Sequence, residues 1–464
     1  MNDTTVQDLG DGLILRRATS ADVEALVDFD ARVHSDAGWD SPDPGVAAWV
    51  RDLMAGSHPT FDVGDFLVVE DPARTTDGQP AIVSSTNLIS QTWTYAGIPF
   101  GVGRIELVGT HPDYRRRGLV RKQFEVLHRW SAERGELIQA ITGIPWYYRQ
   151  FGYDMALNLH GARRGPEGGL PDLKEGATEP YAIRPATVAD LAFIAEVETH
   201  GQRRSLVNCV RDAAQWAYDL SGRTPRNAAH AELRIIETTP AEGAAPSSVG
   251  FLAHPPVLWG STFFATRYEL LPGTSWWAVT PSVLRYLQAT GATLPPYMAD
   301  PDGGPTFKNV GFELGEVHPA YAIVTDWLPI VQASYTWYMR VPDLPAFLRL
   351  IAPALEARLG ASDMAGHSKK LNLDFYRGGV SLTLSDGHIT EVAGWPAERD
   401  SVTELRAGGA YARFPDFTFL QVLFGHRTLG ELRHAYTDCS SNLEGRLLVD
   451  ALFAKQSSEV WPIA

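Results

Sequence analysis

The sequence predicts a mixed α/β and α+β protein of about three domains, and three observations support this prediction. The chain has 464 residues, and 44% of them are hydrophobic, which allows several packed cores. A strand-to-helix turn lies within residues 102–130. A ten-residue segment near the N-terminus, at residues 13–22, is repeated with the same pattern at residues 181–190.

The turn joins a predicted strand at 102–108 to a predicted helix that begins after Gly118. Arg104 and Glu106 share one face of this strand by its period of two. The helix follows from apolar residues at i, i+4 and i+7, which are Val120, Phe124 and Leu127. A turn of this kind directs unpaired backbone N–H groups toward a point in front of the helix, where the helix dipole favours an anion.

Basic side chains surround the turn. They are Arg115, Arg116, Arg117 and Arg121. This charge suits a pyrophosphate or a 3′-phosphate better than a single carboxylate. A basic, solvated loop that only precedes a helix remains the alternative.

The repeated phrase indicates two copies of one fold. Residues 181–190 keep the Arg, Ala, Thr, Ala and Asp of residues 13–22, and Phe151-Gly152-Tyr153 is similar to Val310-Gly311-Phe312 near the end of each copy. Residues 161–180, rich in Gly, Pro and charge, have the composition of a linker. The second copy has no arginine at 271–280, where the basic turn would recur.

A third pattern begins near residue 333. A strand at 337–341, a helix at 344–359 and further strands at 370–376 and 380–384 are expected, and helices are expected at 416–424 and 428–434. Gly378-Gly379 and Asp386-Gly387 suit tight hairpin turns. These elements predict a separate α+β domain.

The composition restricts the class of function. The chain has 40 basic and 55 acidic residues and a net charge of −15, which argues against a general nucleic-acid surface and favours cationic partners. Cys209 and Cys439 have no metal-ligand spacing, and no metal site is expected. The sequence shows no signal peptide and no membrane-spanning run, so we expect a cytoplasmic protein without a membrane partner.

The basic turn also resembles a known family. Arg115-x-x-Gly118-x-Val120 is similar to the acetyl-CoA signature of GNAT-fold N-acetyltransferases, with Val120 in place of the usual Gly or Ala. Together with Phe151-Gly152-Tyr153, the sequence of residues 115–121 resembles that of the Eis-like (enhanced intracellular survival) branch. That resemblance implies two tandem GNAT domains at 1–160 and 181–330, the second degenerate, a linker at 161–180, and a sterol-carrier-protein-like domain at 331–464.

The resemblance further implies an N-acetyltransferase that moves acetyl from acetyl-CoA to a primary amine by direct attack. An aminoglycoside-like polyamine, a lysine side chain and another small cation remain open as acceptors. A homo-oligomer, a hexamer in the family, is expected. Two alternatives remain: a lipid or sterol-like ligand carrier acting through the C-terminal domain, and an acetyl-CoA sensor without turnover.

Site residues follow from the same resemblance. Tyr148, three residues before Phe151, matches the family's proton donor to the CoA thiolate, and the C-terminal carboxylate of Ala464 matches its base. The apolar tail Val460-Trp461-Pro462-Ile463-Ala464 independently predicts a buried terminus. Glu106 is the rival base. The expected acetyl-CoA contacts are Leu107, Val108, Gly109, Thr110, Arg115, Arg116, Arg117, Gly118, Leu119, Val120 and Arg121.

Overall fold

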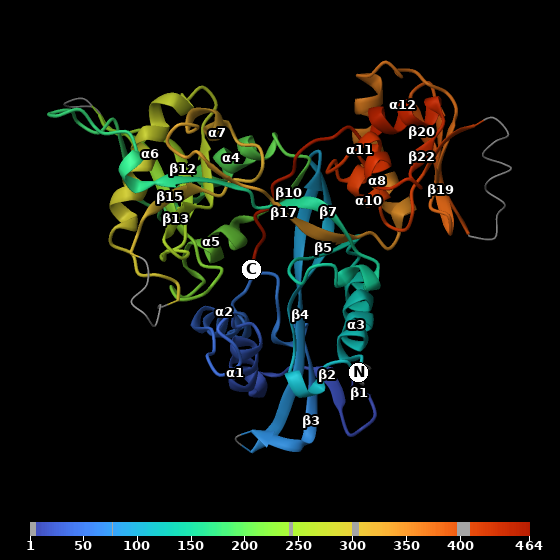
Figure 1. Ribbon diagram of the computed structural model, residues 1–464, viewed down its shortest axis with the longest axis horizontal. Coiled ribbons are helices and arrows are strands. Elements are labelled where there is room, and N and C mark those ends of the chain that lie inside the picture. Colours follow the sequence, from blue (N-terminus) through green and yellow to red (C-terminus); the bar gives the residue numbers. More distant parts are fainter. Residues whose placement is uncertain (1–5, 77, 241–244, 299–305, 397–408) are drawn as a thin grey trace.

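The computed structural model describes residues 6–76, 78–240, 245–298, 306–396 and 409–464. Three bodies of secondary structure surround a pair of long central strands (Figure 1). None of the helices described is long and apolar enough to cross a membrane. The mixed α/β architecture expected from the sequence is confirmed.

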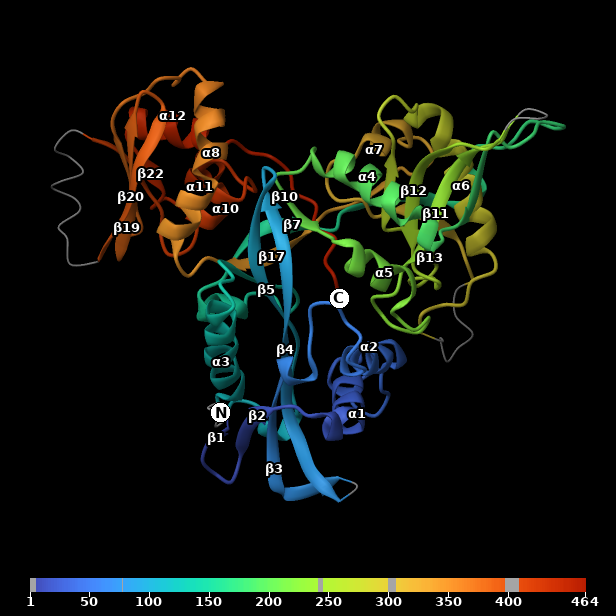
Figure 2. The ribbon, with the colours of Figure 1, turned by 180° about the vertical axis from the view of Figure 1, so that it is seen from behind.

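The first body contains the longest sheet. Its elements are β1 (Gln7–Asp8), β2 (Ile14–Arg17), α1 (Val23–Val33), α2 (Pro44–Met54), β3 (Phe66–Thr76), β4 (Gln79–Tyr95), β5 (Ile98–Thr110), α3 (Leu119–Glu133), β6 (Ile138–Ile141) and β7 (Asp154–Leu159). Ala96 and Gly97 join β4 to β5 with φ of 48° and 84°, the left-handed pair that a two-residue hairpin turn needs. Helices α1 and α2 flank the long strands on one side and α3 on the other (Figures 1 and 2).

The second body is built on two smaller sheets. Its elements are β8 (Ala162–Pro166), β9 (Tyr181–Pro185), α4 (Leu191–Gln202), β10 (Val207–Val210), α5 (Ala213–Ser221), β11 (Glu232–Thr238), β12 (Ser248–His254), β13 (Thr262–Ala265), β14 (Arg267–Leu270), α6 (Trp276–Gly291), β15 (Asn309–Phe312), α7 (Pro319–Ile323) and β16 (Ile330–Gln332). One sheet has the order β14-β12-β11-β9 and the other β13-β15-β8-β16.

The third body packs helices on a sheet of order β20-β19-β18-β21-β22. The remaining elements are β17 (Tyr335–Arg340), α8 (Leu344–Gly360), β18 (Lys370–Asp374), β19 (Gly378–Ser385), β20 (His388–Pro396), β21 (Ala410–Arg413), α10 (Phe419–Leu423), α11 (Leu429–Ala435), β22 (Ser440–Ser441) and α12 (Leu443–Leu452). The predicted strands and helices of this α+β region are therefore present, within a few residues of their expected bounds.

Strand pairing links the three bodies in a way that the sequence did not predict. The first sheet has the order β1-β2-β3-β4-β5-β6-β17-β7, and β10 pairs with β4. Thus β17, which follows the second body in sequence, lies between β6 and β7, whereas β8, which follows β7, pairs with β15 and β16 of the second body. The expected linker 161–180 therefore contains β8, a strand of the second body. The expected boundary at 331 would place β17 in the third body, although β17 pairs in the first sheet.

The repeated phrase adopts the same local structure in both places. Arg16 donates to Asp22 and pairs with Glu70 of the neighbouring strand. In the second body Arg184 does the same with Asp190 and Glu237. Thr19 and Thr187 each form a capping box with the aspartate three residues later.

The two triplets near the ends of the copies differ in local structure. Val310-Gly311-Phe312 lies in β15, which runs parallel to β13. Phe151 instead ends a short 3-10 helix that precedes β7.

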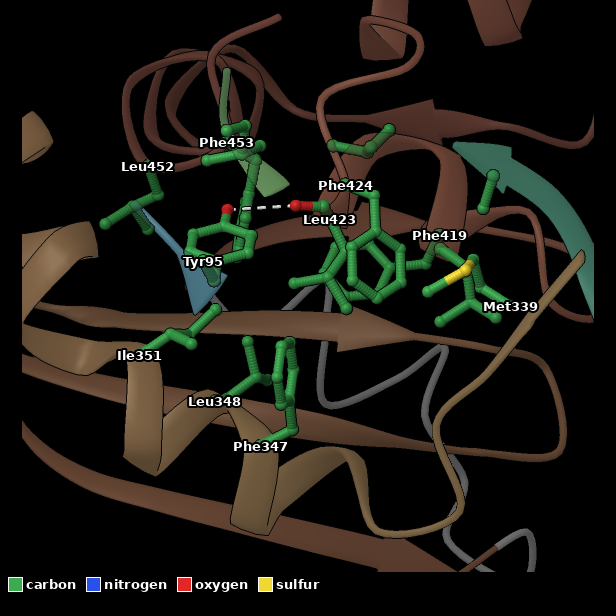
Figure 3. Packing of buried hydrophobic residues seen from close by; sticks show 14 of the residues in the cluster. Tyr95, Met339, Phe347, Leu348, Ile351, Phe419, Leu423, Phe424, Leu452 and Phe453 are labelled. Carbon is green, nitrogen blue, oxygen red and sulfur yellow. Dashed lines mark hydrogen bonds between the residues drawn. The ribbon is translucent and has the colours of Figure 1, made fainter. Parts of the chain in front are cut away.

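A continuous apolar core joins the far end of the first sheet to the third body. Phe347 packs against Tyr95 and Phe100 at ring-centroid distances of 6.1 and 5.2 Å. Figure 3 shows Tyr95 among side chains of the third body, where its hydroxyl donates to the Leu423 carbonyl oxygen at 2.9 Å. Because this core is shared, burial of apolar surface holds the third body against the first sheet.

Candidate functional site

The site begins where two parallel strands separate. β5 pairs with β6 only through residues 102–104, opposite 138–140, but β5 continues to Thr110. A cavity of about 940 Å³ lies beyond this point and is lined by the end of β5, the start of α3 and residues 141–144. The separation of the strands exposes their edges to a ligand.

A β-bulge distorts β5 at the cavity. Ser85 pairs with Gly109 but Asn87 pairs with Glu106, so Leu107 and Val108 stand opposite the single residue Thr86. Leu107 has φ of 51°, in the left-handed region, as the rearrangement requires. A bulge removes a residue from the ladder, so a main-chain amide here is available to a ligand.

Gly109 allows α1 to approach the bulge. A Cβ at Gly109 would lie 2.5 Å from Cγ1 of Val33. A side chain at this position would therefore displace α1, which forms the opposite wall of the cavity.

The N-terminus of α3 faces the same cavity. Its N-cap is Gly118, with φ of 78° and no side chain to bond the first amides. Arg115, Arg116 and Arg121 line the cavity with this helix start. Arg116 makes no hydrogen bond or ion pair within the described part of the chain and is exposed. The predicted anion cradle therefore has free amides and a free guanidinium in one place.

Arg117 differs from the other arginines of the turn. Its guanidinium carbon lies 4.7 Å from the centre of the Tyr114 ring, and its NH2 group donates to the Asp113 carbonyl oxygen at 3.2 Å. It is absent from the cavity lining. Every other residue expected to contact acetyl-CoA lines the cavity.

Tyr148 lies in the cavity wall and is 2% exposed. It packs on Phe124 and Tyr338 at centroid distances of 5.9 and 5.3 Å. Burial, and then the charge of Glu106, raise the pKa of this phenol well above its usual range. Tyr148 is consequently a neutral hydroxyl at physiological pH, in the form that can donate a proton.

Glu106 also lines the cavity and forms an ion pair with Arg104, whose NH2 group is 2.6 Å from Oε1. Arg104 reaches the other way as well, because its NH1 group donates to the Ile463 carbonyl oxygen at 3.0 Å. Gln91 donates to the same oxygen at 2.6 Å. One arginine thus joins the rival base to the C-terminal tail.

The tail itself is buried, as its apolar sequence predicted. Ala464 is 6% exposed, and Arg223 Nε donates to its oxygen at 2.8 Å. Arg211 donates to the Trp461 carbonyl oxygen at 2.9 Å and covers the Trp461 ring at 4.0 Å. Both arginines pair with the buried Asp219. Figures 1 and 2 both place the end of the chain between α2 and α5, beside the long strands.

The structure does not bring all three predicted catalytic groups into one wall. Glu106 and Tyr148 line the cavity, whereas Ala464 is not among its lining residues. The tail reaches the cavity through Arg104.

Sequence reasoning missed the wall formed by α1 and α2. Val33, His34, Val46 and Trp49 line the cavity there. Burial lowers the pKa of His34 to about 4, so this imidazole is neutral at pH 7. An amphipathic helix carries no sign of which of its residues face a ligand, so no sequence signal marks these side chains.

No cluster of three or more His, Cys, Asp or Glu side chains suited to a metal ion occurs among the residues that the structure describes. Both cysteines are buried and free.

Comparisons with known proteins show which family and fold the chain is similar to. Residues 15–156, which lie in the first body, match the acetyltransferase (GNAT) domain family. A search of curated proteins found no matching sequence.

Solved structures share the fold over nearly the whole chain. A GCN5-related N-acetyltransferase from Kribbella flavida is 17% identical with a TM-score of 0.60, covering 99% of both chains. One from Anabaena variabilis is 13% identical with a TM-score of 0.61, covering 97% of this chain and 99% of that one. Eis1 from Mycobacterium abscessus is 15% identical with a TM-score of 0.54, covering 96% and 98%. The chain is therefore similar in fold to GCN5-related N-acetyltransferases.

Proposed function

We propose that the protein is an N-acetyltransferase that moves acetyl from acetyl-CoA to a primary amine in a ternary complex. The observation that carries the proposal is a single cavity that holds a β-bulge, an uncapped helix N-terminus with a free arginine, and a buried tyrosine. The amides of the β-bulge suit the thioester carbonyl of the co-substrate, and the helix start with its arginine suits the pyrophosphate. The buried tyrosine suits the departing thiolate.

The chemistry uses few groups. The amides of the bulge hold the thioester oxygen, and the amides and arginines at the start of α3 hold the phosphates. The amine nitrogen attacks the carbonyl carbon, forming a C–N bond and then breaking the C–S bond. A carboxylate accepts the proton that the amine loses, and Tyr148 gives its proton to the departing sulfur.

Two carboxylates remain candidates for the base, and each is paired with a guanidinium. Glu106 is paired with Arg104, and Arg223 holds the Ala464 oxygen. Glu106 lines the cavity and Ala464 does not, so if Glu106 is the base, the role of the Ala464 carboxylate is to position the amine through the tail. Loss of turnover in Glu106→Gln, with full turnover after a short extension beyond Ala464, would contradict the role of Ala464.

We also propose that the second body is a degenerate copy of the first. The matching networks of Arg16 and Arg184 support a duplication. At the start of α6 the Ser275 side chain itself bonds the Ala278 amide, whereas α3 has no such cap. Its helix start is capped and residues 271–280 contain no arginine, so the second copy is not expected to bind acetyl-CoA.

The third body supports a second candidate function. A cavity of about 590 Å³ there is lined largely by apolar side chains, including Phe375, Phe417 and Phe419. This cavity is compatible with a sterol-carrier-like domain that carries a lipid. Binding of a fluorescent fatty acid that Phe419→Asp removes, without thiol release from acetyl-CoA, would favour the carrier over the enzyme.

The deciding experiment is release of free thiol from acetyl-CoA with a panel of amines: an aminoglycoside, a lysine peptide and a small diamine. We expect release that depends on one class of amine and that Tyr148→Phe reduces. Tight acetyl-CoA binding with no release for any amine would instead identify a sensor. Oligomeric state, expected to be a hexamer, is measured in the same preparation by light scattering.

A further inference from the structure

A second cavity, of about 320 Å³, lies between the second body and the C-terminal tail. Its walls are the loop after α4, residues 316–319 at the start of α7, and tail residues 457–459. It adjoins a smaller pocket that shares Arg204, His318 and Glu459 and reaches Glu269 of β14. Neither has a lining residue in common with the proposed acyl-transfer cavity.

Two carboxylate side chains that line these pockets, Glu269 and Glu459, each have a buried oxygen without a hydrogen-bond partner among the residues that the structure describes. Glu269 is 4% exposed, and although Arg204 donates to Oε1, Oε2 has no hydrogen-bond partner within the described residues. The same is true of Oε2 of Glu459, whose side chain is 18% exposed. Buried polar atoms are normally hydrogen-bonded, so these two oxygens indicate a ligand that carries N–H or O–H donors.

His318 does not donate a hydrogen bond to either of these Oε2 atoms. Its Nδ1 accepts from the Ala320 amide at 3.2 Å, which places the ring proton on Nε2. Nε2 is 3.7 Å from Oε1 of Glu269, beyond hydrogen-bond distance, and faces the oxygen that Arg204 already bonds.

The charges favour a cation. Three acidic side chains, Glu269, Glu316 and Glu459, line the cavity and the adjoining pocket, and Glu198 lies next to them, paired with Arg267 of the pocket wall. Two guanidinium groups oppose them: Arg204, bonded to Glu269, and Arg267, bonded to Glu198 with its NH1 group 3.9 Å from Glu459. Carboxylates therefore outnumber cations here, in contrast to the arginine-rich acyl-transfer cavity.

Gly201 and Gly315, which have no side chain, leave space for the carboxylates of Glu269 and Glu459. A Cβ at Gly201 would lie 2.5 Å from Oε1 of Glu269, and a Cβ at Gly315 would collide with Oε2 of Glu459. A side chain at either position would push a carboxylate out of place.

We propose that this cavity and the smaller pocket beside it together bind a small organic ammonium ion, which contacts Glu459 and Glu269 and thereby fastens the C-terminal tail to the second body. The tail is already held nearby, because the Leu206 amide donates to the Ser457 carbonyl oxygen at 3.0 Å and the Val207 amide to the Ser458 hydroxyl at 3.1 Å. The ion adds a contact between Glu459, on the tail, and Glu269, on β14.

Calorimetric titration of the full-length protein with putrescine (1,4-diaminobutane), without acetyl-CoA, tests the site. We expect binding of putrescine but not of 1,4-butanediol, and an affinity at least about tenfold weaker in both Glu269→Gln and Glu459→Gln, because each loses a charge-assisted contact. Burial raises the pKa of Glu459 to about 8. A bound cation favours its charged form, so binding at pH 7 should release a proton and its heat should vary with the buffer.

Two control variants separate this site from other acidic regions. Glu196→Gln removes the same charge from an exposed position on α4, and Glu106→Gln alters the acyl-transfer cavity. Glu196→Gln should keep the wild-type affinity, and Glu106→Gln reports any putrescine that binds in the acyl-transfer cavity instead. Loss of binding in Glu106→Gln with none in Glu269→Gln would place putrescine in the other cavity and refute the proposal. Equal weakening in Glu196→Gln, or no binding at all, would refute it as well.

Hydrogen exchange measures the effect on the tail. Putrescine should slow exchange of amides in residues 455–464 of the wild type but not of Glu459→Gln. The Glu459 variant keeps a neutral side chain of the same shape, so it should fold even if Glu269→Gln does not. Unchanged exchange in the wild type at saturating putrescine would refute the fastening of the tail.

Discussion

Arg116 and Arg117 are adjacent in sequence but differ in the structure, and this difference makes a direct test of the cofactor cradle. Arg116 lines the cavity with a free guanidinium, whereas Arg117 lies outside it over Tyr114. We therefore predict that Arg116→Gln weakens acetyl-CoA binding and that Arg117→Gln does not. The matched pair removes one positive charge in each case.

The magnitude follows from the exposure of Arg116. A charge-assisted hydrogen bond contributes about 1.5–3 kcal/mol, or roughly 10–150-fold in Kd. Arg116 is exposed, so solvent screening places the expected loss near the lower limit, about tenfold. Its backbone has φ of 64°, and glutamine bears the same conformational cost as arginine, so the stability should not change.

Calorimetric titration with acetyl-CoA at two salt concentrations measures the effect. The Arg116→Gln variant should show a smaller salt dependence than the wild type, because one phosphate contact is lost. Arg117→Gln should stay within about threefold of wild type, as expected for a surface charge outside the contact. Equal losses in the two variants, or none in Arg116→Gln, would refute the assignment of this helix start to the phosphates.

Three further predictions concern the proton donor, the docking of the third body and the tail. Tyr148→Phe should lower kcat by about 10²–10⁴-fold while acetyl-CoA affinity stays within twofold to threefold, measured by thiol release and titration; a normal kcat would exclude this phenol as the acid. Tyr95→Phe should cost about 1–3 kcal/mol of unfolding free energy, because the Leu423 carbonyl oxygen is left unpaired in the core, and a melting temperature equal to wild type would contradict that. The folded pKa of Glu459, about 8, exceeds its unfolded value, so its contribution to stability is full below about pH 4 and is lost as the pH rises to 8. The free energy of unfolding of Glu459→Gln should therefore fall less steeply with pH than that of the wild type, by up to about 1.4 kcal/mol per pH unit across that range. Equal slopes in the variant and the wild type would show that the buried carboxyl does not titrate there.

Local patterns in the sequence predicted local structure well. The strand before Thr110, the glycine turn at Gly118 and α3 after it were all expected, because the period of two, a left-handed glycine and helical spacing are set by neighbouring residues. The duplicated phrase also predicted equivalent structure, since the Arg16 and Arg184 networks close within each copy and the next strand.

The separation of β5 from β6 has no such local signal. The pattern around Leu107 reads as a regular strand, and the bulge appears only when pairing with β4 fixes the register. Likewise, Arg117 belongs to the same basic run as Arg116, and only the path of the backbone turns one inward and the other over Tyr114.

The sequence by itself determined the class of fold, the cationic turn and the burial of an apolar tail, because each depends on residue type and short-range spacing. The candidate proton donor, Tyr148, was expected only from the family resemblance. The tertiary structure alone decided that β8 and β17 lie in sheets away from their sequence neighbours, that α1 and α2 form a cavity wall, and that Arg104 joins Glu106 to Ile463. These arrangements bring together residues up to hundreds of positions apart, and their cause is the shared burial of surfaces that no single segment covers.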